Sequence, residues 1–79
     1  MTEEEWSMFI RLVNVTGDVY EVANGSGGKF LNGFADAMND VVFTMIGFMA
    51  TNGVKRTDIE NRMVRGGCDP GIAHSYVYD

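Results

Sequence analysis

The sequence predicts an all-α fold, a small single-domain helical bundle of about four helices with one long central helix, spanning residues 1–79. Three observations support this prediction: capping signals at helix starts, apolar residues at helical spacing, and glycine pairs where the pattern stops. A chain of 79 residues is expected to form one domain, and its single cysteine excludes an intrachain disulfide. Stability must therefore come from a well-packed core or from a partner chain.

The first predicted helix begins at a capping box. Thr2 is a good N-cap, and Glu5 follows three residues later, with Glu3 to Glu5 favoured at the positive end of the helix. Apolar residues then recur at helical spacing: Trp6, Phe9, Ile10 and Val13. Residues 9–22 also allow a β-hairpin around Thr16-Gly17-Asp18, which the β-branched residues favour. The capping box and the weak alternation favour the helix.

The stretch "NGSGG", residues 24–28, predicts a turn between two helices. Its glycines resemble a phosphate-binding loop, but Ala23 and Phe30 stand where a Walker A motif needs glycine and a hydroxyl residue. We therefore expect no nucleotide and no other cofactor to bind here.

The main helix is predicted to start at Lys29 and to end at Asn52-Gly53. Its apolar face is predicted from 3.6-residue spacing to contain Phe30, Phe34, Met38, Val41, Met45, Phe48 and Met49. Asp36, Asn39 and Asp40 lie on the opposite side. The segment Val41–Ala50 is apolar on every face and must be buried on every face. Either the flanking helices wrap it, or a homodimer or a partner groove covers it.

The tail is predicted to form two short helices. A second capping box, Thr57 with Glu60, opens a helix that has Ile59 and Met63 on one face and ends at Gly66-Gly67. Asp69 and Pro70 supply the N-cap and the first helical position of the last helix. That helix is expected to pack Ile72, Ala73, Tyr76 and Val77.

No constellation in the sequence predicts catalysis or metal binding, so the protein is expected not to be an enzyme. One histidine and one cysteine cannot form a Cys/His zinc site. Cys68 at a helix N-terminus is expected to have a lowered pKa. His74 is expected to lie at the surface or half-buried, without pairing with Cys68.

The formal net charge is −5, and the acidic residues gather in the first half of the chain. An acidic domain does not bind nucleic acid by neutralising phosphates, but it can bind a basic protein surface. The tail bears a basic group, Lys55, Arg56, Arg62 and Arg65, which leaves a helix-turn-helix-like DNA-binding regulator as an alternative. An acidic N-terminus and a longest apolar run about half the length of a membrane span predict a cytoplasmic protein without a membrane partner.

The acidic start "MTEEEW" and the acids Asp18, Glu21, Asp36 and Asp40, in a short chain without a catalytic set, resemble the small phage-type anti-CRISPR proteins that act on type I, Cascade-based systems. The resemblance implies stoichiometric binding to a Cas subunit in the host bacterial cytoplasm, which blocks DNA binding or cleavage. The expected partner-binding face consists of Glu3, Glu4, Glu5, Trp6, Asp36 and Asp40. The alternative is a small dimeric helical regulator or adaptor that associates through Val41–Ala50.

Overall fold

The computed structural model describes residues 1–26 and 29–78, and these residues form four α-helices without a strand. The helices are α1 (Glu3–Ser26), α2 (Lys29–Thr51), α3 (Arg56–Arg65) and α4 (Pro70–Tyr78). The all-α prediction is confirmed. None of the described helices is long and apolar enough to cross a membrane.

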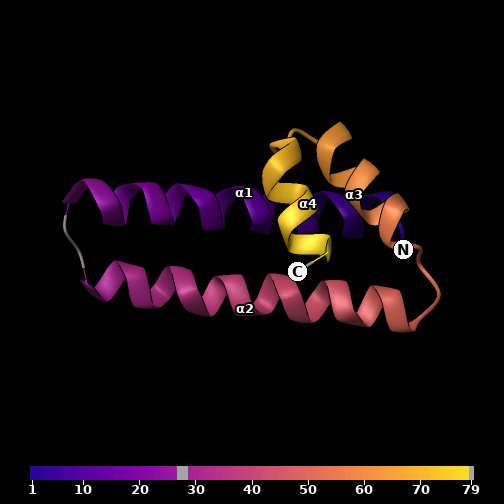
Figure 1. The fold of residues 1–79 in the computed structure, drawn as a ribbon, viewed down its shortest axis with the longest axis horizontal. Coiled ribbons are helices and arrows are strands. Elements are labelled where there is room, and N and C mark those ends of the chain that lie inside the picture. The colour runs from indigo at the N-terminus through magenta and orange to yellow at the C-terminus, as the bar shows by residue number, and fades with distance from the viewer. Residues whose placement is uncertain (27–28, 79) are drawn as a thin grey trace.

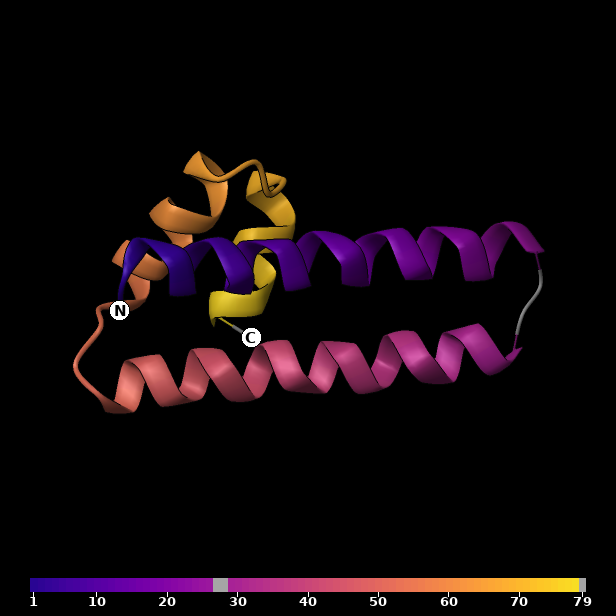
Figure 2. The ribbon, with the colours of Figure 1, turned by 180° about the vertical axis from the view of Figure 1, so that it is seen from behind.

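The α1 and α2 helices form a long antiparallel hairpin, and α3 and α4 pack against one end of it (Figure 1). Figure 2, seen from behind, shows that the other end of the hairpin extends beyond both short helices. Because α1 has 24 residues and α2 has 23, the molecule has two long helices where the sequence predicts one.

Residues 9–22 are helical throughout, so the alternative β-hairpin is wrong. The α1 helix also continues through Asn24 and Gly25 to Ser26, which places its end later than the predicted break at Asn24. The rest of the predicted turn, residues 27 and 28, lies outside the described residues.

Local signals define four of the helix ends as predicted. The Thr2 backbone N–H donates to Glu5 Oε1 at 2.8 Å, and the Glu5 N–H donates to Thr2 Oγ1 at 3.1 Å, which completes the capping box. At the end of α2, Gly53 has a φ of 90°, and the Val54 N–H donates to the Met49 carbonyl at 3.0 Å in a Schellman motif.

The same motif ends α3, where Gly67 has a φ of 104° and the Cys68 N–H donates to the Met63 carbonyl at 2.9 Å. One residue later, Asp69 Oδ2 accepts from the Ile72 N–H at 3.2 Å and caps α4. The α3–α4 connection is therefore a tight turn held by backbone and side-chain hydrogen bonds.

The predicted capping box at Thr57 is wrong. The N-cap of α3 is Lys55, in an extended conformation and without a side-chain cap, and the helix begins at Arg56. The Lys55 carbonyl already accepts the N–H groups of Asp58 and Ile59. The preceding Schellman motif positions Val54, which is half-buried and packs against the core. The α3 helix therefore begins two residues earlier than predicted.

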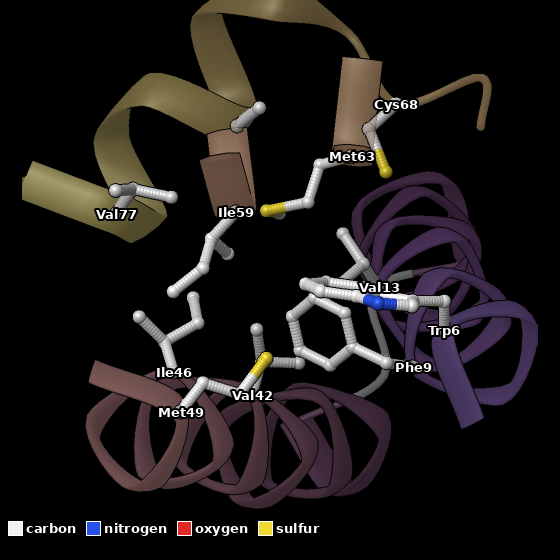
Figure 3. Packing of buried hydrophobic residues seen from close by; sticks show 11 residues of the cluster. Trp6, Phe9, Val13, Val42, Ile46, Met49, Ile59, Met63, Cys68 and Val77 are labelled. Atoms are coloured by element: carbon white, nitrogen blue, oxygen red, sulfur yellow. The ribbon is translucent and has the colours of Figure 1, made fainter. Parts of the chain in front are cut away.

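The core lies where all four helices meet (Figure 3). The hairpin and the two short helices contribute residues that are nearly or fully buried: Trp6, Phe9 and Val13 from α1, Val42, Ile46 and Met49 from α2, Ile59 and Met63 from α3, and Ala73 and Val77 from α4. The predicted inward positions of α3 are confirmed. In α4, Ala73 and Val77 are buried and Tyr76 is half-buried, but Ile72, also predicted to pack inward, is exposed.

The predicted apolar face of α2 is largely wrong. The buried face consists of Ala35, Val42, Ile46 and Met49, whereas Phe30 and Phe48 are 78% and 66% exposed, and Phe34 and Val41 are also exposed. The flanking helices therefore do not wrap the Val41–Ala50 segment. Because the second half of α2 is apolar on nearly every face, periodicity alone does not determine which side faces α1.

Two glycine substitutions, one within α2 and one just after it, are expected to change stability in opposite directions. Gly53→Ala forces an L-residue into the left-handed region and should lower the free energy of unfolding by about 1 kcal/mol. Gly47→Ala lies within the helix, and its added methyl group would meet no neighbouring atom within 4 Å. It should raise the free energy of unfolding by about 0.5–1 kcal/mol. Urea denaturation followed by circular dichroism measures both, and equal effects of the two changes would contradict the C-cap assignment.

Candidate functional site

An open groove of about 830 Å³ lies between α1, α2 and α4, and we call it the acidic groove. Asp18 and Glu21 of α1 line one side of it, and Asp69 lines the other side at the start of α4. The described residues that line it include no Lys, Arg or His, so its negative charge has no counter-ion within the groove.

The apolar part of the acidic groove is aromatic. Phe43 of α2 and Tyr76 of α4 pack edge to face, with ring centroids 5.0 Å apart and planes at 60°. Desolvation by burial raises the pKa of the half-buried Tyr76. The groove therefore combines carboxylates with an apolar surface, an arrangement that suits a side chain with a long aliphatic stem and a cationic head.

Helical spacing explains how α1 supplies its part of the groove. Asn14, Gly17, Asp18 and Glu21 are separated by three, one and three residues and therefore lie along one side of the helix. The groove exists because α4 crosses the hairpin at this side (Figure 1). No local sequence signal predicts that crossing, so the sequence predicts Asp69 only as a helix cap.

Asp36 and Asp40, two of the predicted site residues, lie on α2 close to the acidic groove. Asp36 Oδ1 accepts a 2.6 Å hydrogen bond from the hydroxyl of Tyr20, a groove residue. This hydrogen bond, burial and the charge of Asp36, with a smaller contribution from Asp40, raise the pKa of Tyr20 to about 12. Both carboxylates therefore extend the negative field of the groove.

Glu3, Glu4 and Glu5, the other predicted acids, lie at the opposite end of α1. Glu3 Oε1 forms a 2.8 Å ion pair with Arg62 Nη2 of α3. Glu5 is held by the capping box, which lowers its pKa through hydrogen bonds from the backbone and side chain of Thr2. Of the three, Glu3 and Glu5 thus have structural roles.

Trp6 is a core residue, not the exposed anchor that the sequence predicts. Its side chain is 9% exposed and packs edge to face on Phe9, with ring centroids 6.2 Å apart. The Arg62 guanidinium lies over the indole ring at 5.0 Å. Together with Glu3, this stack joins the start of α1 to α3.

The predicted acidic face is thus divided into two separate regions. Glu5 and Tyr20 are 15 residues apart on one straight helix, which corresponds to about 22 Å. Asp36, bonded to Tyr20, is therefore remote from Glu3, Glu4 and Glu5. The groove residues Asp18 and Glu21, which the sequence marks only as part of the general acidity, are the nearer partners of Asp36 and Asp40.

Cys68 and His74 do not form a reactive pair. Cys68 is 4% exposed, and burial raises the pKa of its thiol, so the predicted lowering is wrong. His74 is exposed, as expected, and its Nδ1 lies 2.8 Å from Glu60 Oε2. Among the described residues, no group of three or more His, Cys, Asp or Glu side chains is arranged to hold a metal ion.

Two of the basic side chains of the tail form contacts within the fold. Arg56 Nη1 donates to the Val77 carbonyl at 2.7 Å and Arg62 pairs with Glu3, so two of the four bases proposed to contact DNA have roles within the fold. The α4 helix, which would be the recognition helix, carries no Lys or Arg. These contacts weigh against the DNA-binding alternative.

The Tyr20–Asp36 hydrogen bond is testable by titration. Asp36→Asn should lower the pKa of Tyr20 from about 12 toward its ordinary value, because the phenolate no longer faces a carboxylate. Since folding raises this pKa, the stabilisation is present below the ordinary value of 10 and is lost between pH 10 and about 12. NMR titration of the tyrosine ring carbons measures the shift, with Asp40→Asn as the control that should change it much less.

Comparisons of the chain with protein-family models, with curated proteins and with solved structures found no match.

Proposed function

We propose that this chain is a non-enzymatic inhibitor that binds a basic protein surface through its acidic groove. The observation that carries the proposal is the groove itself, with Asp18, Glu21 and Asp69 around an aromatic wall and no cation among the described residues that line it. Asp36 and Asp40 add negative charge near its edge.

The chemistry of the groove suits an arginine or a lysine side chain of the partner. The aliphatic stem would pack against Phe43 and Tyr76, and the cationic head would reach the carboxylates on either side. A charged contact of this kind gains most of its strength from being partly desolvated between the helices. It also speeds association with a basic surface and makes binding weaker at high salt.

The target we propose is a type I CRISPR–Cas surveillance complex or its nuclease, which makes the chain an anti-CRISPR protein. Such complexes must hold DNA in a channel rich in Lys and Arg, and carboxylates on rigid helices can occupy those cations as phosphates do. The net charge of −5 and the general resemblance to small phage-type inhibitors support this target. Occupying the channel would block DNA binding or cleavage by simple exclusion.

Neutralising the groove should weaken binding to a purified Cascade complex or nuclease. The double variant Asp18→Asn, Glu21→Gln is expected to raise the dissociation constant by about tenfold or more, since each partner cation loses a carboxylate. Calorimetry or surface plasmon resonance measures the change, and circular dichroism checks the fold.

The matched control is Glu4→Gln with Asp58→Asn, which removes two negative charges from exposed positions outside the groove. It should change the dissociation constant by less than about threefold, the range of exposed surface charges. Equal losses in both variants would assign binding to net charge and not to the groove. Failure of the wild-type chain to bind either Cas target would refute the anti-CRISPR proposal.

A further inference from the structure

The side of the hairpin opposite the acidic groove is a predominantly apolar surface, which we call the outer face. On α1 it follows residues spaced alternately by four and three: Met8, Leu12, Val15, Val19 and Val22. On α2 the same spacing gives Phe30, Phe34, Ala37 and Val41, and beyond the polar Thr44 it reaches Phe48. Such alternation is the pattern of a helix–helix seam.

The two rows belong to one surface. Met8 of α1 and Met45, Phe48 and Met49 of α2 line the same shallow groove, so the hairpin presents both rows to the same side. A second hollow beside Phe30, Phe34 and Ala37 continues the apolar surface toward the hairpin tip. Between Phe30 and Phe48 the only charged residues of α2 are Asp36 and Asp40, which face the other side.

The outer face is well exposed. Most of the large apolar side chains that are exposed in the described part of the chain lie on it, including Met8, Val15, Val22, Phe34 and Val41. The molecule exposes 5090 Å², more than the roughly 4700 Å² expected for a compact monomer of its mass. Contiguous apolar patches of this extent are uncommon on soluble monomers and mark an interaction surface.

We propose that a second copy of this chain covers the outer face, so that two hairpins pack into a four-helix bundle. This inference is independent of the proposed function, because it concerns the side of the hairpin away from the acidic groove.

The width and length of the face favour a second hairpin over a single helix. From Phe30 to Phe48 the row is about 27 Å long, and two adjacent helices are about 20 Å wide, so one partner helix would leave half of it in water. Two copies would together bury more than about 1,000 Å², which is the area that a specific interface needs. A self-complementary pair of helical hairpins is also a common bundle architecture.

The charge of the chain gives the association a distinctive salt dependence. Each copy carries a net charge of −5, so two copies repel one another, and the apolar contact must outweigh that repulsion. Added salt should therefore strengthen self-association, whereas it should weaken binding of a basic partner in the acidic groove. The two proposals can fail separately.

Sedimentation equilibrium of the wild-type chain is expected to give twice the 8.7 kDa mass of one chain. Val41→Glu on the outer face should raise the dimer dissociation constant by about 100-fold or more, because two carboxylates would have to be buried against apolar side chains. The matched control is Val64→Glu, an exposed valine of α3, which should leave the constant unchanged within about threefold.

A measurement on the wild-type chain avoids any effect of the substitution on folding. In a dilution series followed by methyl NMR, the Val15 and Val41 signals should shift with concentration, and the Val64 signals should not. A wild-type chain that stays monomeric at millimolar concentration would overturn the proposal. So would a dimer in which Val64 shifts and Val41 does not, because its interface would lie elsewhere.

Discussion

The short helices α3 and α4, with 10 and 9 residues, can cover only one side of one end of a hairpin whose helices have 24 and 23 residues. Because α3 and α4 are so short, the core lies at one end of the hairpin, where all four helices meet. Their shortness also accounts for both surfaces that are proposed to bind a partner. The acidic groove is the junction where α4 crosses the hairpin, and the outer face is the side for which no helix remains.

The far half of the hairpin depends on a different kind of packing. Thr16, Ala23 and Ala35 are fully buried there, and their small side chains allow the two helices to approach closely. Thr16 satisfies its hydroxyl by donating to the Leu12 carbonyl at 2.7 Å, so it can be buried without a polar penalty. Little apolar area is buried in this half, and its stability must rely on helix propensity and on whatever packs against it.

Signals that act within one turn of helix predict the fold well. The Thr2–Glu5 box, the Asn52-Gly53 stop and the Asp69-Pro70 start are all confirmed, because a cap depends on residues three or four apart. The box at Thr57 fails because an earlier turn already fixes where α3 begins. The inward face of α2 depends on tertiary contacts. The spacing of apolar residues does not predict it, because the second half of this helix is apolar on nearly every face.

The candidate site shows the same division between local and tertiary information. Acidity in the first half is visible in the sequence, but its distribution in space depends on the direction of α1 and the crossing of α4. Glu3 and Asp36 look equivalent as acids, yet one pairs with Arg62 and the other accepts from Tyr20 at the far end of the hairpin. The size of Trp6 is typical of an interface anchor, and the same size places it in the core.

The buried thiol of Cys68 is a natural probe of local opening of the structure. It is the only cysteine in the sequence and lies in the core, at the turn between α3 and α4. Because only 4% of Cys68 is exposed, a thiol-specific reagent should react with it slowly until the structure around this turn opens, so the labelling rate reports how often that opening occurs. The folding equilibrium can thus be followed at one defined point without introducing a probe.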